Sequence, residues 1–314
     1  MSVPMSVLMS NLVGLFLLMA VGVVLVKGKA VPITVTGYLS KLLMTVMSPA
    51  MIVRSMLQPF SADFLKDSAV VFAAGFGLYL LSIATAQVLT RVLRISRNRR
   101  GLWTLCVAFP NNGFMGFPII QALLGDNALA LAAIMGIPFN MLLYTLGVKV
   151  LLADRAGAGE GETVSLRKIL LTPTNVATAL GLALFLLQIP IPQALYTPID
   201  YLANMATPMS MLIIGMGLTR CSLPRVLRDR DALWAALSKL VVLPVLVYCL
   251  VKFLPFGNAL IAPVIFITVA MPTAAVIPAL AEQHGIRPEL GVESNFLTGL
   301  FCILTVPLLL SLSL

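Results

Sequence analysis

The stretch that decides the fold is Val107-Ala108-Phe109-Pro110-Asn111-Asn112-Gly113-Phe114-Met115-Gly116-Phe117-Pro118, in the middle of an apolar segment from about residue 101 to 125. That segment has the ~20 residues that a helix needs to cross a bilayer. Its centre holds two prolines, two asparagines and two glycines. We predict a broken helix, because proline removes a backbone donor and clashes with the preceding turn. Unpaired backbone groups are costly in hydrocarbon, so the break must be buried in protein or line a wet cavity.

A second stretch repeats the pattern: Val269-Ala270-Met271-Pro272-Thr273-Ala274-Ala275-Val276-Ile277-Pro278, inside an apolar segment from about residue 259 to 284. Both stretches open with Val-Ala-x-Pro, and in both a glycine follows seven residues after the second proline, at Gly125 and Gly285. Two ordinary proline kinks are the simpler interpretation. Matched interruptions in the two halves of a membrane protein favour a substrate-binding site instead.

Composition predicts an all-α polytopic membrane protein. Of the 314 residues, 60% are hydrophobic and only 11% are charged, which is more apolar surface than a soluble domain could bury. The net charge of +9 comes from basic residues in short loops, so we expect a lipid bilayer and no nucleic acid as partner. Ten transmembrane helices are predicted, at about residues 5–26, 33–57, 68–93, 101–125, 128–152, 174–187, 196–218, 232–254, 259–284 and 289–312.

The ten predicted spans divide into two five-span repeats, residues 1–152 and 169–314, joined by a cytoplasmic linker at residues 153–168. Besides the breaks, residues 45–51 of span two resemble residues 204–210 of span seven. Because five is odd, the second repeat is predicted to be inverted relative to the first. Sixteen Lys and Arg residues fall on one side of this topology and three on the other. The positive-inside rule therefore predicts a multi-pass protein of the inner (plasma) membrane with both termini on the extracytoplasmic side.

No constellation for catalysis is present, and we predict neither an enzyme nor a cofactor or metal site. The only histidine is His284, and no Walker motif appears. The carboxylates lie in loops or near span ends, which argues against a cation exchanger. Glu282 and Glu293 are the least peripheral and are candidate coupling residues. Lys41 and Lys239 fall inside predicted spans, where each could snorkel to the interface or face a cavity and attract an anion.

The two breaks suit a small polar anion. The second half of each broken helix begins near the membrane midplane with free N–H groups, which carry partial positive charge. The side chains of Asn111, Asn112 and Thr273 would add donors. The first halves also present free carbonyls, so this argument leaves a cation open. The candidate substrate-binding residues are Pro110, Asn111, Asn112, Gly113, Phe114, Asn140, Tyr144, Lys239, Pro272, Thr273, Ala274, Ala275 and Val276.

Several of these motifs resemble the auxin efflux carrier family, which includes plant auxin exporters and bacterial malonate or malate permeases. The matching segments are residues 110–118, Tyr144-Thr145-Leu146, Thr207-Pro208 with Gly215-Met216-Gly217-Leu218, and Lys239-Leu240 with Pro244. The resemblance covers the whole chain, and the short loop between the halves is like that of the bacterial members. It implies a fold similar to bile-acid and sodium/proton carriers, with crossing helices four and nine. Spans one, two, six and seven would form a dimerising scaffold, and spans three to five and eight to ten a moving transport domain.

The predicted function is therefore secondary active or facilitative transport of small organic carboxylate anions by an elevator-type mechanism, with a homodimer as the expected assembly. A sodium-coupled carrier of the bile-acid type is one alternative, and sodium-dependent uptake would favour it. A membrane sensor that binds a ligand without moving it is the other. The lack of a soluble output domain counts against the sensor.

Overall fold

The computed structural model describes residues 5–153, 171–219, 223–254 and 256–313. These residues form α-helices, four short π-helical turns, one 3₁₀ turn and a single isolated backbone bridge. The elements in chain order are α1 (Met5–Lys27), α2 (Val35–Leu42), η1 (Leu43–Met47), α3 (Ser48–Met56), α4 (Ala62–Val92), η2 (Arg97–Arg99), α5 (Arg100–Ala108), η3 (Asn112–Gly116), α6 (Phe117–Leu124), α7 (Asp126–Leu142), η4 (Leu143–Gly147), α8 (Val148–Leu152), α10 (Pro173–Leu187), α11 (Gln193–Gly217), α12 (Leu223–Val226), α13 (Arg230–Leu237), η5 (Ser238–Val242), α14 (Leu243–Val251), α15 (Ile261–Ala270), α16 (Ile277–Gln283) and α17 (Glu289–Ser313).

The prediction of an all-helical membrane protein is confirmed. Within the described residues, five continuous helical segments are long and apolar enough to cross a membrane: Val35–Met56, Ala62–Val92, Asp126–Leu152, Arg230–Val251 and Glu289–Leu309. The ten-span count and the inverted repeat stay predictions. The predicted linker lies outside the described residues except for its first residue.

One helix boundary differs clearly from the sequence-based range. We expected a loop over residues 58–67, but α4 begins at Ala62. The cause is a local cap, since the side chain of Ser61 accepts a hydrogen bond from the backbone N–H of Phe64 at 3.2 Å. Hydropathy does not detect this first turn of α4 as helix, because the turn is polar.

Three of the four π-helical turns share a sequence signal, a proline two residues after the turn ends. Pro49 follows η1, Pro118 follows η3 and Pro244 follows η5. Proline in a regular α-helix removes one hydrogen bond and its ring clashes with the carbonyl four residues earlier. A π-turn bonds residue i to i+5, and the wider turn gives this ring room. The helices that contain these prolines therefore continue past them.

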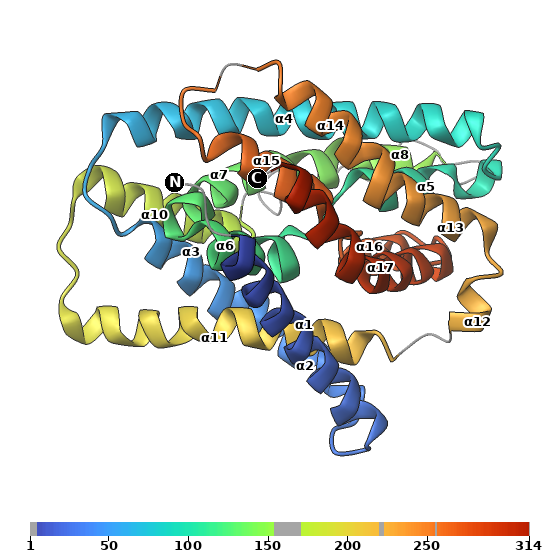
Figure 1. Ribbon diagram of the computed structural model, residues 1–314, viewed down its shortest axis with the longest axis horizontal. Coiled ribbons are helices and arrows are strands. Elements are labelled where there is room, and N and C mark those ends of the chain that lie inside the picture. Colours follow the sequence, from blue (N-terminus) through green and yellow to red (C-terminus); the bar gives the residue numbers. More distant parts are fainter. Residues whose placement is uncertain (1–4, 154–170, 220–222, 255, 314) are drawn as a thin grey trace.

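Figure 1 shows α4 and α11 running along opposite sides of the molecule, with the broken helices between them. The helix α1 crosses α11, and the contact is made by backbone. A Cβ atom built on Gly215 would lie 1.9 Å from the carbonyl oxygen of Met19, and one on Gly22 would lie 2.3 Å from that of Leu212. Only glycine permits so close an approach, as at other helix crossings in membranes.

Helices pack in two sets. In the first, α1, α3 and α10 all contact α11 or one another. In the second, α4 packs on α5 and α7, and α13 packs on α17. The two sets meet where α7 contacts α3 and α10. The fold therefore contains a seam between α7 and the α3–α10 pair.

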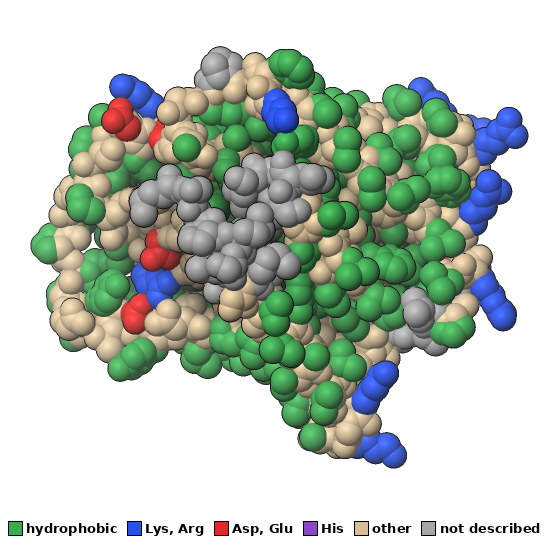
Figure 2. All heavy atoms as spheres, viewed as in Figure 1, with side chains coloured by type: hydrophobic (Ala, Val, Ile, Leu, Met, Phe, Trp, Pro, Cys, Tyr) green, Lys and Arg blue, Asp and Glu red, His purple; other side chains and the backbone are tan. Residues whose placement is uncertain are grey.

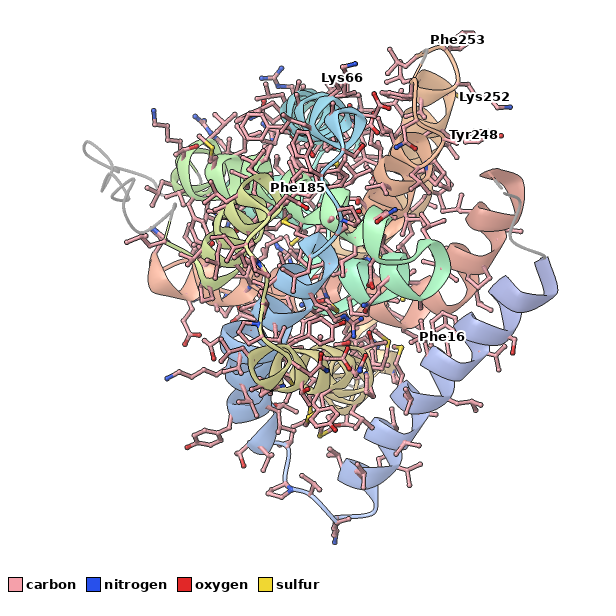
Figure 3. The ribbon with its side chains drawn as sticks, turned by 90° about the vertical axis from the view of Figure 1, so that its left-hand side faces the viewer. Phe16, Lys66, Phe185, Tyr248, Lys252 and Phe253 are labelled. Atoms are coloured by element: carbon pink, nitrogen blue, oxygen red, sulfur yellow. The ribbon has the colours of Figure 1, made fainter. Side chains whose placement is uncertain are left out.

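The exterior is apolar along its sides and basic at one end. Figure 2 shows Lys and Arg side chains gathered at the end where α4 runs into α5 and where α13 begins. Figure 3 shows Phe253 at the outer edge of the molecule, where it is 86% exposed, and Phe185 in the interior, where it is buried. Exposed apolar side chains of this kind suit a lipid surface.

Candidate functional site

The first break begins where α5 ends at Ala108. Phe109 is extended (φ −105°, ψ 115°), as expected for the residue before a proline. Pro110 forms a backbone bridge, the chain turns at Asn111 (φ −79°, ψ 70°), and η3 begins at Asn112. The side chain of Asn111 caps the new helix by accepting a hydrogen bond from the N–H of Phe114 at 3.4 Å. The predicted interruption is thus present at the predicted residues.

The second break follows the same logic. The helix α15 ends at Ala270, and Met271, which precedes Pro272, is extended with ψ 151°. The chain resumes as α16 at Ile277. Five residues therefore separate the extended Met271 from the next helix.

The two breaks pair with each other. Pro110 and Thr273 form an antiparallel bridge. The N–H of Asn111 donates to the carbonyl of Pro272 at 2.8 Å, and the N–H of Ala274 donates to the carbonyl of Phe109 at 3.0 Å. Backbone groups that each break exposes are satisfied by the other break, which is how unwound backbone can lie at membrane depth.

Thr273 repairs a defect that a proline creates in the other half of the chain. The carbonyl of Cys106 would normally accept from the N–H of residue 110, but Pro110 has none. The hydroxyl of Thr273 donates to this carbonyl instead, at 2.8 Å. Its N–H donates to the hydroxyl of Thr298 on α17 at 3.1 Å. Thr273 is fully buried, so its polar groups serve the crossing rather than an open cavity.

A tyrosine that the sequence reasoning missed supports the first break. The side-chain nitrogen of Asn112 donates to the hydroxyl of Tyr79 on α4 at 3.0 Å. The Tyr79 ring stacks on Phe109 with centroids 6.0 Å apart and meets the edge of Phe139 at 5.6 Å. The signal available in the sequence was a tyrosine in the middle of an apolar span, because a buried phenol hydroxyl needs a partner. The oxygen of the Asn112 amide is buried without a partner among the described residues.

Some backbone donors beside the crossing are left over. No described residue accepts a hydrogen bond from the N–H of Gly113, Ala275 or Val276. All three residues are partly accessible, whereas Asn111 and Asn112 are each 6% exposed and Thr273 is buried. A Cβ on Gly113 would lie 3.0 Å from the terminal methyl of Met44 in η1, so Gly113 faces the neighbouring helix set. These three residues are among the sequence-based candidates, whereas the predicted side-chain donors Asn111, Asn112 and Thr273 are buried. Phe114 is partly accessible, while Pro110, Pro272 and Ala274 are buried.

Lys239 lies on η5 and is fully buried. Neither environment predicted for it, the interface or an open cavity, is seen. Among the described residues no carboxylate forms an ion pair with it. Its π-turn packs against α5, α13 and α17. A buried lysine within a candidate membrane span stays a candidate functional residue.

Four further candidates lie elsewhere. The side chain of Asn140 on α7 donates to Asn175 on α10 at 2.7 Å, so it bridges the seam between the two helix sets. Tyr144 is half-buried on η4. Glu282 is exposed near the end of α16, and Glu293 is half-buried on α17. These four residues do not join the hydrogen bonds of the crossing described above.

Ionic contacts tie the loop before α5 to the start of α13. Arg99 donates to Asp229 at 2.6 Å and to Asp231 at 2.9 Å. Burial lowers the pKa of Arg99, but the hydrogen bond to Asp229 and the nearby carboxylates outweigh it and raise the pKa overall. Burial raises the pKa of Asp229, and hydrogen bonds from Arg99 and the Ala232 amide outweigh it and lower the pKa. Glu293 also interacts with this cluster.

The other broken helix has an equivalent contact. The side chain of Asn258, in the loop before α15, donates to Asp67 near the start of α4 at 2.5 Å. In each half, the loop before the broken helix thus binds the first turns of a helix from the other half. Each of these two contacts therefore ties a broken helix to the other half of the chain.

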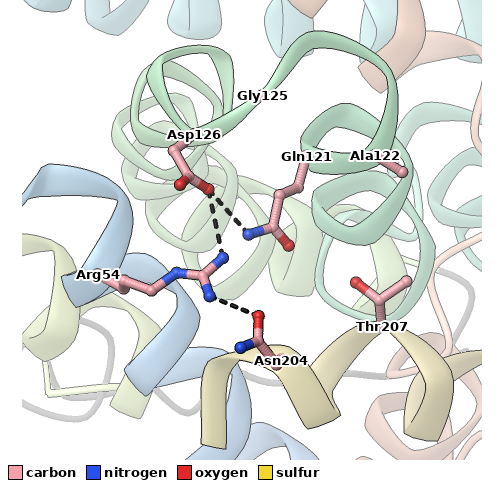
Figure 4. Close-up of a pocket in the computed structure, with 7 residues that line it drawn as sticks. All are labelled: Arg54, Gln121, Ala122, Gly125, Asp126, Asn204 and Thr207. Carbon is pink, nitrogen blue, oxygen red and sulfur yellow. Dashed lines mark hydrogen bonds and ion pairs between the residues drawn. The ribbon is translucent and has the colours of Figure 1, made fainter. Parts of the chain in front are cut away.

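A pocket of about 350 Å³ opens at the end of the molecule where α3 ends and α7 begins. Figure 4 shows Arg54 in its centre, between Asp126 and Asn204. Arg54 donates to Asp200 at 2.8 Å and to Asn204 at 2.6 Å, both on α11, and lies 3.5 Å from the carboxylate of Asp126 on α7. Sequence reasoning did not find this site, because its members are far apart in the chain.

Comparison with known proteins decides the family. A family model described as membrane transport protein matches residues 7–310. The chain belongs to this family. It is the auxin efflux carrier family whose resemblance the motifs showed, and that prediction is confirmed. The transporter is a multi-pass membrane protein and not an enzyme.

Relatives of the transporter are distant. A Rhizobium meliloti protein is named for malonate transport, in a name that marks the assignment as provisional, and is 26% identical over 65% of this chain and 64% of its own length. The match therefore spans less than two thirds of that relative. Uncharacterized transporters of Methanothermobacter thermautotrophicus and Methanocaldococcus jannaschii are 25% and 22% identical, over 86% and 78% of both chains respectively.

Proposed function

We propose that the protein is a secondary active or facilitative carrier of small organic carboxylate anions, which bind beside the paired breaks. The observation that carries the proposal is that Gly113, Ala275 and Val276, three partly accessible residues, have backbone N–H groups without an acceptor among the described residues. A carboxylate accepts several hydrogen bonds at once and suits unbonded backbone donors of this kind. The name of the Rhizobium meliloti relative adds malonate as a probe.

Because the two breaks pair with each other, some of the donors predicted to bind the substrate are already used. Thr273 and the N–H of Asn111 are already bonded within the protein. We therefore propose that the substrate binds to the unbonded N–H groups, that of Gly113 on one side of the Pro110–Thr273 bridge or those of Ala275 and Val276 on the other. Asn112 can serve it by rotating its amide: the oxygen would then accept from the Tyr79 hydroxyl and the nitrogen would face the anion. Oxygen and nitrogen assignments of this kind follow the hydrogen-bond network.

Elevator-type movement is our proposed mechanism. Two packed helix sets that meet along the α7 seam support it, because one set can slide against the other as a rigid body. The proposed scaffold contains α1, α2–α3, α10 and α11, and the transport domain contains α4–α8 and α13–α17. The gathering of basic side chains at one end supports the predicted orientation, with that end in the cytoplasm. The homodimer expected for the family would use the scaffold.

Coupling is proposed to involve Glu293 rather than Glu282. Glu293 lies with Arg99 and Asp229 against α5, the first half of a broken helix, whereas Glu282 is exposed. A dependence of uptake on sodium in proteoliposomes would instead favour the bile-acid type of carrier.

Binding of malonate and a carboxylate panel to purified variants tests the position of the site. A hydrogen bond to a charged group contributes about 1.5–3 kcal/mol, and ~1.4 kcal/mol is tenfold in affinity. Asn112→Ala should therefore weaken binding, measured by calorimetry, roughly ten- to a hundredfold. Ser48→Ala, a buried scaffold hydroxyl, is the matched control and should bind like the parent. Parental affinity in Asn112→Ala would place the anion elsewhere.

A further inference from the structure

The pocket around Arg54 joins the two helix sets. Arg54 stands on the last turn of α3, and its partners Asp200 and Asn204 lie on α11. Asp126 is the first residue of α7. The guanidinium therefore connects the proposed scaffold to the proposed transport domain at the end of the molecule opposite the basic cluster. Opening this side requires the contact with Asp126 to break.

The contacts of Arg54 are unequal. One terminal nitrogen has two short bonds, at 2.8 Å to Asp200 and 2.6 Å to Asn204. The other has only the 3.5 Å contact to Asp126, whose side chain is 49% exposed. The Arg54 side chain is only 13% exposed, and its Nε atom is buried without a partner among the described residues. Asp200 and Asn204 thus hold the guanidinium in place, while its Asp126 side remains weakly bonded.

The space beside this weak contact suits a small anion with a carboxylate. At about 350 Å³ the pocket is at the lower end of the range for small-ligand sites, about 300–1,000 Å³. The amide of Gln121 bonds Asp126 at 2.9 Å, and the Thr207 side chain lines the opposite wall. Two carboxylates already face Arg54, so an added anion would be repelled unless it replaced one of them. Asp126 is the one that can leave, because its contact is longer and more exposed to solvent.

We propose that this pocket is a second carboxylate-binding subsite, in which a carboxylate of the cargo takes the place of Asp126 on the guanidinium of Arg54. The inference rests on the proposed function. Occupation releases the ionic contact between Asp126 at the start of α7 and Arg54 on α3, so the cargo itself removes one of the contacts between the two helix sets on this side. The exchange leaves the charge around Arg54 unchanged, since one carboxylate replaces another. Arg suits the role because its planar fork binds carboxylates through two bonds.

Site-specific protection from labelling tests the subsite separately from the crossing. Ala122 lines the pocket and is exposed. It would be changed to Cys in a Cys221→Ser, Cys249→Ser background; of the remaining cysteines, Cys106 and Cys302 are both buried. The rate of reaction with a membrane-impermeant maleimide is measured against acetate, malonate and succinate, with chloride at equal ionic strength as the reference. We expect at least one carboxylate to slow the reaction in a saturable way, and no slowing at Ala62→Cys, which is exposed outside the pocket.

Charge variants then identify the groups involved. The quantity compared is the carboxylate concentration that halves the labelling rate at Ala122→Cys, called the half-protecting concentration. Asp126→Asn removes the side chain that competes for Arg54 and should lower this concentration about two- to fivefold, as expected from the free energy of an exposed ion pair. Asp63→Asn, which removes a fully solvated pair with Lys66, should leave it unchanged. Arg54→Gln with Asp200→Asn deletes the anchor without leaving a buried charge and should raise it at least tenfold. Arg54→Lys keeps the charge but loses the fork, and serves as the second test if the double variant does not fold.

The outcomes separate the two proposals. Protection at Ala122→Cys that survives Asn112→Ala supports a subsite distinct from the crossing. Protection that is lost in Asn112→Ala, or is unaffected by Asp126→Asn and both Arg54 changes, overturns the subsite. Absence of protection by all three carboxylates also overturns it. If the protein still binds a carboxylate in that case, the proposed function stands alone.

Discussion

The bond from the Thr273 hydroxyl to the Cys106 carbonyl is the most exacting test of the crossing. We predict that Thr273→Val destabilises the protein although the two side chains have nearly the same shape. The carbonyl has lost its usual helical donor to Pro110, and Thr273 lies fully buried beside it. Removing the hydroxyl leaves a buried acceptor unpaired, at a cost of about 1–3 kcal/mol. The additional methyl group of valine stabilises the protein by less than this cost, because it only replaces the hydroxyl within a packed site.

The assay is thermal unfolding of the purified protein in detergent. With an unfolding entropy of about 2.1 cal/mol/K per residue, a chain of 314 residues loses roughly 2–5 °C of Tm for this cost. The control is Thr104→Val on α5, the helix that contains Cys106. The Thr104 hydroxyl donates at 2.8 Å to the carbonyl of Arg100, which lies one turn earlier and can still accept from the N–H of residue 104. A Tm for Thr273→Val equal to the parent, or an equal loss in Thr104→Val, would refute the repair of the broken helix by Thr273.

Two other predictions concern the scaffold and the basic end of the molecule. Gly215→Val should strongly destabilise the contact between α1 and α11 and lower expression and Tm, because its Cβ would meet the Met19 carbonyl at 1.9 Å, whereas Gly217→Ala, with no atom within 4 Å, should be tolerated. Asp229→Asn should lower Tm at neutral pH. The folded-state pKa of Asp229 is depressed, so its stabilisation is present above the unfolded value of about 3.9 and is lost as the pH falls through the folded value. The Tm difference between parent and variant should therefore shrink below about pH 4, and a difference that persists unchanged at low pH would contradict the ionic role of Asp229.

Local chemistry explains why the sequence predicted the helical spans and the breaks. Hydropathy over about 20 residues reports whether a segment can lie in lipid. Proline acts on the turn that contains it, so Pro110 and Pro272 mark interruptions wherever the rest of the chain lies. The same locality accounts for the π-helical turns before Pro49 and Pro244, which the sequence analysis did not predict. The cap at Ser61 was readable in principle and was overridden by the polarity of the first turn of α4.

Only the tertiary structure decided which polar groups remain available at the candidate site. The hydroxyl of Thr273 and the backbone N–H of Asn111 were sensible donors in the sequence, but each is bonded to a residue more than 150 positions away. Tyr79 and Arg54 gained their roles from partners on other helices. Hydrogen bonds depend on separations of about 3 Å in space, and the sequence carries no direct measure of such distances between its halves. The composition of each helix determined where the chain unwinds, and the crossing of the helices determined which of the described polar groups there were left without a partner.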